Sequence, residues 1–313
     1  MRMRSPVARH SPSGDDRPTD PPAVSDPTFV SFHADRPAGL VGPHPNANLD
    51  TAGYRRMLDM LFRSVRLCHP TARCVLLTDR GTRIDGIRGP VQRVDGPVDH
   101  GALMLSRSLA QDAFVARHDF ARPLVLLDSD ILLNGSLQPL FAEDFDVGVT
   151  WRPIKNMPLN GGLIVLHHRR PDVSRAFFAK FVRTYRERFA GDGNAAWYGD
   201  QLALQECVGL DRKQLAQQEL VVKDGCRIRL LPCDTYNFSP ENRLDAIADG
   251  LPDKLVLHFK GQRKRLMEPF WRTFLAPRLH AWWFPQTRAK KARERLQELI
   301  ANEPPPATPA PAG

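Results

Sequence analysis

Short apolar runs alternate along the chain with longer amphipathic stretches. The apolar runs are typical of buried strands, whereas apolar residues spaced three to four positions apart are typical of helices. The expected strands are residues 29–34, 73–79, 91–96, 123–130, 146–152 and 159–168. The expected helices are residues 53–67, 101–118, 171–190 and 200–208. This alternation predicts an α/β fold.

Some of the expected strands are apolar at every position, as in the run 125–127. A strand of this kind is buried on both faces, which is typical of a parallel sheet covered by helices on each side. We therefore expect a mostly parallel central sheet flanked by helices. Ligands bind at the carboxyl ends of the strands in such sheets, so candidate site residues should lie there.

Two carboxylates follow the apolar run 125–127. Asp128 and Asp130, on either side of Ser129, can both reach one hard divalent cation if the chain turns at this point. The alternative is a pair of solvated acids at a strand–loop junction. Because apolar residues precede and follow the pair, it is expected inside the fold, where two carboxylates without a cation are costly. We predict a Mg²⁺ or Mn²⁺ site.

A second candidate follows the strand-like run 254–258. His258 is a possible metal ligand, Gly261 permits close approach of the backbone to a phosphate, and Lys264 offers a positive charge. The alternative is a buried histidine followed by a basic turn.

Two further segments carry polar or small residues beside apolar ones. Asn160, Gly161 and Gly162 precede an apolar strand, where the lack of side chains would let a ligand lie against the backbone. The alternative is a bulge or turn into that strand. Asp200 and Gln201 open an apolar helix, and the alternative for Asp200 is an ordinary N-cap.

The order of these four segments resembles glycosyltransferase family 8, the retaining nucleotide-sugar transferases with a GT-A (Rossmann-like) fold. The segments are DSD, NGG before a strand, DQ opening a helix, and H-x-x-G-x-x-K. The resemblance runs from about Phe29 to Lys264, and the last segment is the most specific to the family.

The resemblance implies a role for each matching position. Asp128, Asp130 and His258 would be ligands of Mn²⁺ (or Mg²⁺). The donor-binding residues would be Asp35, Asp128, Ser129, Asn160, Gly161, Gly261 and Lys264. Asp35 would contact the nucleobase, and Asn160 the donor sugar. Asp200 and Gln201 would be the catalytic residues beside the anomeric carbon.

Three departures from the family pattern are visible. A Pro/Gly/Asn-rich insertion at residues 36–53 follows Asp35, Arg265-Leu266 replaces the usual Pro-Trp after the lysine, and Leu202 replaces the second acid of D-Q-D. We therefore interpret the chain as a divergent member.

The positive charge is concentrated in one part of the chain. The chain of 313 residues has a formal net charge of +9, and residues 260–295 hold eleven Lys and Arg against Glu268 and Glu294. The basic character thus belongs to the C-terminal segment. We expect a disordered tail at 1–27, a GT-A domain at 28–268, a basic and aromatic helical segment at 269–302, and a disordered Pro/Ala tail at 303–313.

Aromatic residues beside a basic amphipathic helix suit the surface of an anionic membrane. Residues 270–284 include Phe270, Trp271, Phe274, Trp282, Trp283 and Phe284, and residues 285–300 form the amphipathic stretch. The alternative is a helix docked on the domain with a solvated charged face. Five cysteines without a C-x-x-C pair favour reduced thiols. We therefore expect a cytoplasmic protein, peripheral on the inner face of the plasma membrane.

The expected function is transfer of a sugar from a UDP-sugar to an acceptor hydroxyl, with retention, on a glycolipid or lipopolysaccharide or other surface glycan. One rival is a non-catalytic basic protein on a degenerate transferase fold that binds membrane or nucleic acid. Another is a phosphatase of the haloacid-dehalogenase type, which also places D-x-D after an apolar strand. That class expects a threonine or similar residue at position 132, where this chain has leucine.

Overall fold

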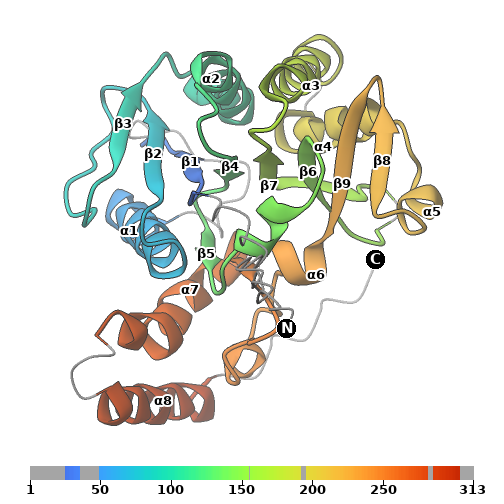
Figure 1. Ribbon diagram of the computed structural model, residues 1–313. Helices are drawn as coiled ribbons and strands as arrows, with labels where there is room; N and C mark the ends of the chain where they lie inside the picture. The colour runs from blue at the N-terminus through green and yellow to red at the C-terminus, as the bar shows by residue number, and fades with distance from the viewer. Residues whose placement is uncertain (1–24, 36–48, 155, 192–194, 281–284, 304–313) are drawn as a thin grey trace, which may run out of the picture.

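The computed structural model describes residues 25–35, 49–154, 156–191, 195–280 and 285–303. Its centre is an eight-stranded sheet in the order β3-β2-β1-β4-β7-β6-β9-β8 (Figure 1). The strands are β1 (Thr28–Phe32), β2 (Arg73–Thr78), β3 (Gln92–Asp95), β4 (Leu124–Leu127), β6 (Val147–Trp151), β7 (Leu159–Leu166), β8 (Leu220–Lys223) and β9 (Cys226–Pro232). The predicted α/β fold is confirmed.

The two halves of this sheet differ in strand direction. β3, β2, β1 and β4 are all parallel, as the pattern predicts. β7 runs antiparallel to both β4 and β6, and β8 runs antiparallel to β9, while β6 and β9 are parallel. A short turn makes the last hairpin possible, because Asp224 and Gly225 both adopt positive φ angles. The patterning did not reveal β8, whose outer residues are exposed.

Helices cover both faces of the sheet. The helices of the described ranges are α1 (Thr51–Cys68), α2 (Leu103–Arg117), α3 (Pro171–Thr184), α4 (Ala195–Val208), α5 (Arg212–Leu215), α6 (Cys233–Tyr236), α7 (Lys264–Phe270) and α8 (Pro285–Ala301). α2, α3 and α4 pack on one face, and α1 packs on the other (Figure 1). Residues of one strand alternate between the two faces, so that Val30 joins one core and Phe29 the other. The uniformly apolar strands follow from this double burial.

A second, two-stranded sheet positions the site. β5 (Ile131–Leu133) pairs antiparallel with β10 (Val256–His258), so that His258 lies opposite Ile131. These strands are three residues long, and all six residues are buried. The pairing brings the segment after Asp130 against a segment more than 120 residues later in the chain.

The C-terminal segment packs against α1 and the small sheet. α7, a π-helical turn (Trp271–Leu275) and α8 share a core with Met57 and Leu257 (Figure 1). Phe270 and Trp271, expected at a membrane surface, are buried in this core. The predicted boundary at residue 269 falls inside α7.

Several expectations concern residues outside the described ranges. The tails 1–24 and 304–313, most of the 36–53 insertion, and Trp282, Trp283 and Phe284 belong to this group. Within the described ranges, no helix combines the length and apolar character needed to cross a membrane.

Candidate active site and metal centre

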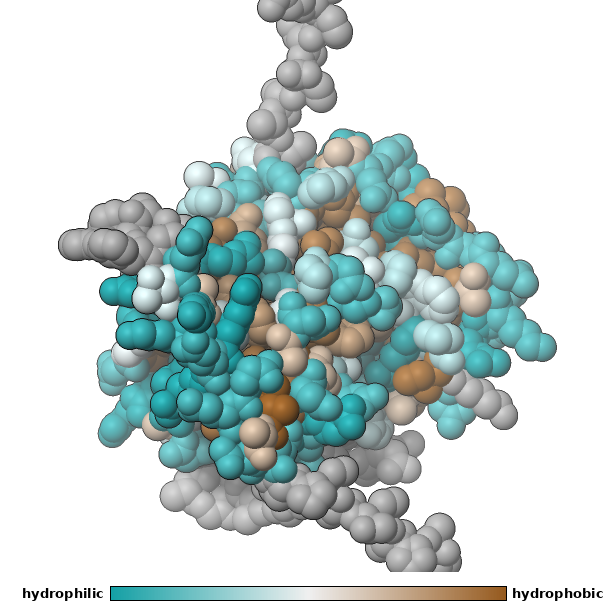
Figure 2. Space-filling model, turned by 90° about the horizontal axis from the view of Figure 1, so that it is seen from below, coloured by the Kyte–Doolittle hydropathy of each residue, from teal (hydrophilic) through white to brown (hydrophobic). Residues whose placement is uncertain are grey.

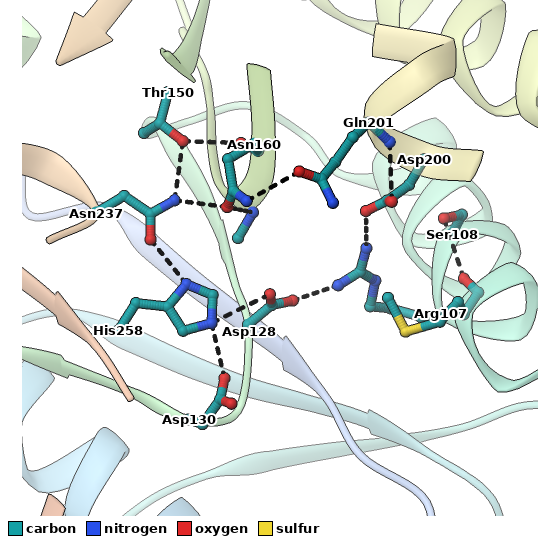
Figure 3. A network of polar contacts seen from close by, with 12 residues as sticks. Arg107, Ser108, Asp128, Asp130, Thr150, Asn160, Asp200, Gln201, Asn237 and His258 are labelled. Carbon is teal, nitrogen blue, oxygen red and sulfur yellow. Dashed lines mark hydrogen bonds and ion pairs between the residues drawn. The ribbon is translucent and has the colours of Figure 1, made fainter. Parts of the chain in front are cut away.

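Three side chains converge at the carboxyl end of β4. Asp128 directly follows β4, Asp130 closes the turn that leads into β5, and His258 ends β10. Phe259 N donates a hydrogen bond of 2.8 Å to the Asp130 carbonyl, which fixes the two chain segments together. One ligand atom from each of Asp128, Asp130 and His258 lies within 4.8 Å of the other two (Figure 3). The structure thus brings together the three residues that the resemblance named as metal ligands.

A chain of hydrogen bonds determines which nitrogen of His258 carries its proton. The Gly162 backbone N–H can only donate, so the Asn160 side-chain oxygen accepts from it at 3.0 Å. Asn237 Nδ2 donates to that same oxygen at 2.7 Å and to Thr150 Oγ1 at 2.9 Å. The amide oxygen of Asn237 must therefore be the atom that faces His258 Nδ1, at 2.7 Å. It accepts, so Nδ1 carries the proton.

The other nitrogen of His258 consequently presents a lone pair to the two carboxylates. His258 Nε2 lies 2.9 Å from Asp130 Oδ1 and 3.5 Å from Asp128 Oδ2 (Figure 3). Burial lowers the pKa of His258, with a further contribution from Lys260, which favours the neutral ring. A lone pair on an imidazole nitrogen and two carboxylates that converge on one point form a suitable set of ligands for a cation. The residues therefore fit a divalent metal ion.

Two basic side chains pair with these carboxylates. Lys264 Nζ lies 3.1 Å from Asp130 Oδ2. Burial opposes the charged form of Asp130, whereas the positive charge of Lys264 and its hydrogen bond lower the pKa of Asp130. Arg107 on α2 bridges Asp128 and Asp200, with Nη2 2.6 Å from Asp200 Oδ2 (Figure 3).

Sequence reasoning missed Arg107, Thr150 and Asn237. Arg107 is 7% exposed, although an arginine in an amphipathic helix is ordinarily on the solvent side. Its neighbours Ser106 and Ser108 are also buried. The available signal was therefore a run of three polar residues between two leucines of the helix. Thr150 and Asn237 belong to no recognisable motif, and only the fold brings them to the site.

Asp200 and Gln201 lie in the second turn of α4 and face the same site. The helix begins at Ala195, so the alternative of Asp200 as an N-cap is wrong. Burial raises the pKa of Asp200, and the charge of Asp128 raises it further against the opposing effect of Arg107. Gln201 Oε1 accepts from Asn160 Nδ2 at 3.2 Å and from Arg152 Nη2 at 3.1 Å.

The glycines before the apolar part of β7 make room for site side chains. A Cβ at Gly162 would lie 2.6 Å from Cε1 of His258, and a Cβ at Gly161 would lie 2.9 Å from Oδ2 of Asp200. We expected these glycines to admit a ligand. The structure gives a different physical reason, since any larger residue would displace His258 or Asp200.

The remaining predicted residues lie around this centre. Ser129 occupies the turn between β4 and β5. Gly261 adopts a φ of +58°, a left-handed conformation, and a Cβ there would meet open space. Asp35 follows β1 on the other side of β4, where its carboxylate contacts His33 Nε2 at 3.0 Å and accepts from Arg83 N at 3.0 Å. Asp35 is therefore at the same edge but outside the three-residue cluster.

The basic residues of α8 lie on the surface. Leu296 is the buried contact of this helix, whereas its Arg and Lys side chains are exposed. The face of the molecule on which α8 lies is largely hydrophilic in Figure 2. In the described part of the chain, α8 is thus a docked helix with a solvated basic face.

Comparisons with known proteins add the following. No protein-family model matches the chain, and no curated protein matches it. Its structure is similar to the glycosyltransferase GlyE of Streptococcus pneumoniae TIGR4, at 16% identity over 91% of this chain and 66% of that chain, with a TM-score of 0.47. It is also similar to the galactosyltransferase LgtC in complex with donor and acceptor sugar analogs, at 16% identity, 89% and 98% coverage, and a TM-score of 0.46.

A third similar structure is a glycosyltransferase involved in the glycosylation of the major capsid of PBCV-1, at 13% identity over 78% of this chain and 99% of that chain, with a TM-score of 0.43. All three similar structures are glycosyltransferases. Because the identities are below 25% and the TM-scores below 0.5, the function of this chain has to be argued from its own residues. Membership of family 8 stays a prediction.

Proposed function

We propose that this protein is a glycosyltransferase that moves a sugar from a nucleotide-sugar donor to an acceptor hydroxyl, with retention of configuration. The observation that carries the proposal is the lone pair of His258 Nε2 held between Asp128 and Asp130 by the Asn160–Asn237 hydrogen bonds. Nitrogen and oxygen ligands together favour Mn²⁺ over Mg²⁺, which prefers oxygen alone. When bound, the ion would neutralise the negative charge that develops on the departing nucleoside diphosphate.

The residues around the cluster support binding of a diphosphate. Lys264 lies at the cluster edge and can exchange its contact with Asp130 for a phosphate oxygen. The open backbone at Gly261 leaves room for the same group. Ser129 and Asp35 extend the donor site toward β1, where Asp35 would contact the nucleobase. We take the nucleotide to be UDP, on the resemblance alone.

Retention is proposed to proceed without a covalent sugar–enzyme bond. Both carboxylate oxygens of Asp200 are engaged, since Oδ2 pairs with Arg107 and Oδ1 accepts from Gln201 N at 2.8 Å. A carboxylate held in this way is suited to stabilise positive charge on the sugar rather than to attack it. Asn160 and Gln201 would position the sugar, and a leaving phosphate oxygen would take the proton of the acceptor hydroxyl.

The acceptor is proposed to be part of a glycolipid, a lipopolysaccharide or another surface glycan. The exposed basic residues of α8 support peripheral contact with an anionic leaflet on the cytoplasmic side. Flotation with liposomes of neutral and anionic composition measures this contact. Protein that stays in solution with anionic liposomes at physiological salt would remove this part of the proposal.

A thermal-shift titration tests the donor site. UDP, GDP, CMP and ADP are each added with Mn²⁺ and with EDTA, and a nucleotide at about 100 times its dissociation constant should stabilise the protein by about 2.7 kcal/mol. We expect stabilisation by UDP that EDTA abolishes. Stabilisation by none of the four nucleotides would contradict the proposal and leave the rival of a non-catalytic basic protein, which the solvated face of α8 also fits.

Substitution of a single ligand tests the metal assignment. Asp130→Asn removes a charged ligand with little change in shape. We expect the stabilisation by Mn²⁺ to be lost and the rate of sugar transfer to fall by about a thousandfold. Asp253→Asn is a matched control, because Asp253 is an exposed acid that pairs with Lys254 and not with the cluster. An Asp130→Asn protein that binds Mn²⁺ normally would sink the assignment. The phosphatase alternative has no support at position 132, where Leu132 is fully buried.

A further inference from the structure

A second group of positive charge lies beside the metal cluster and has no place in the donor site. Arg152 follows β6, and Lys260 follows His258 by two residues. In the sheet order, β1 and β4 lie on one side of β7, and β6 and β9 lie on the other. Asp35 marks the nucleobase side and the cluster on β4 the diphosphate, so Arg152 lies at the opposite end of the donor, beyond Asn160.

Lys260 is a cation without a counter-ion. Within the described ranges, its ammonium group makes no hydrogen bond and no ion pair. It lies within electrostatic range of Arg152 and of Cys233, which follows β9, as well as of Asp128 and Asp130. Lys260 is half-buried beside a second cation, and two neighbouring cations without a counter-ion attract an anionic ligand.

Arg152 is held in place by two hydrogen bonds, and one of its nitrogens is left without a partner among the described residues. Its Nε donates to the Met157 carbonyl at 3.2 Å, and its Nη2 donates to Gln201 Oε1 at 3.1 Å. Among the described residues, Nη1 has no partner. A guanidinium fixed on one side and open on the other is preorganised for a planar or tetrahedral anion. Its bond to Gln201 places it next to the residue proposed to lie by the sugar.

We propose that Arg152 and Lys260 form a subsite for a carboxylate or phosphate group on the acceptor substrate. The inference rests on the proposed transferase function and specifies an acidic acceptor. The donor diphosphate has its own partners in Lys264 and the metal cluster, on the β4 side. Arg152 on the β6 side and its neighbour Lys260 are two further cations, in excess of what a nucleotide-sugar needs.

Matched acidic and neutral probes test this subsite. Methyl β-glucuronide, glucose 6-phosphate and inorganic phosphate are titrated against methyl β-glucoside, by saturation-transfer NMR, in the presence of saturating UDP and Mn²⁺. We expect at least one acidic probe to bind about tenfold more tightly than the neutral glucoside. Arg152→Gln and Lys260→Met should each remove that preference. Arg117→Gln and Lys213→Met, at exposed positions, are the controls and should keep it.

The affinity for UDP and Mn²⁺, measured on the same variants, separates the possible failures. We expect it to change less than about twofold, because neither side chain belongs to the donor site. If Lys260→Met weakens the binding of UDP as much as the binding of the acidic probe, Lys260 serves the diphosphate and the proposed acceptor subsite is wrong. If wild-type protein binds UDP with Mn²⁺ but no acidic probe, the transferase proposal stands and this inference fails. Acidic-probe binding without any UDP binding would contradict the transferase proposal instead.

Discussion

The amino ends and the carboxyl ends of the parallel strands β4 and β6 carry buried charge in different ways. At the amino end, the carboxylate of Asp146 has an exposed fraction of 0% and pairs with Arg170 and Arg227. Arg170 Nε donates to it at 2.7 Å, Arg170 Nη2 pairs with its other oxygen, and the Arg227 backbone N–H donates at 2.7 Å. At the carboxyl end, Asp128, Asp130 and Asp200 share the paired cations Arg107 and Lys264.

The pKa values of Asp146 and Asp200 shift in opposite directions. Burial opposes the charged form of Asp146, but Arg170 and Arg227 outweigh it and lower its pKa. Burial raises the pKa of Asp200 and is not overcome there, because Asp128 adds repulsion to it. The amino end is thus a satisfied structural ion pair, whereas at the carboxyl end Asp200 is not balanced by Arg107, which it shares with Asp128. The unbalanced end is the one that we assign to function.

The largest effect on stability is expected when one acid at each end is neutralised. Asp146→Asn should lower the free energy of unfolding by about 2 kcal/mol, or the melting temperature by about 5 °C, because a satisfied buried carboxylate is lost. Arg170 is 40% exposed and can return to water, which keeps the cost below that of a fully buried pair. Asp128→Asn should change the stability by less than about 1 kcal/mol, because Arg107 retains Asp200. Calorimetry of both variants gives the values, and equal losses would remove the distinction.

A second test concerns the hydrogen bonds that orient His258. Asn237→Ala removes the acceptor of the Nδ1 proton and should weaken Mn²⁺ binding by about 10- to 100-fold, as for other residues that orient a metal ligand. Titration of Mn²⁺ by calorimetry measures the affinity, and circular dichroism checks the fold. Asn302→Ala, at an exposed position of the C-terminal end, is the control. An unchanged Mn²⁺ affinity in folded Asn237→Ala protein would show that the ring needs no such support.

The three residues of the candidate metal cluster could be predicted from sequence, but the residues that orient His258 could not. The resemblance to family 8 named Asp128, Asp130 and His258 together, and the structure brings them together. Asn237 is a single polar residue after a short helix, and its role depends on the pairing of β5 with β10. The run 254–258 has the pattern of a strand, but nothing in its pattern shows that it pairs with the three residues of β5. Arg107 was missed because helical periodicity alone assigns an arginine to solvent.

The smallest effect on stability is expected from His167, which lies beside Asp146 at the amino end of β6. Its backbone N–H donates to the Asp146 carbonyl at 2.8 Å. Its Nδ1 accepts from Arg169 N at 3.2 Å, so Nε2 carries the proton and donates to the Phe141 carbonyl at 3.1 Å. Both ring nitrogens are therefore satisfied in the neutral form. Burial lowers the pKa of His167 to about 4, from a usual value of 6.5.

The sign of the pH effect follows from that lowered pKa. Between pH 6.5 and 4 the unfolded chain binds a proton that the folded protein does not, so stability falls as the pH falls. Lowering the pH from 6.5 to 5.5 should cost about 1 kcal/mol through His167 alone. His167→Gln cannot titrate in this range, and its melting temperature should decrease less steeply over the same interval. Parallel pH profiles of the two proteins would show instead that His167 is protonated in the folded state, and that the satisfied end of the sheet tolerates a charge there.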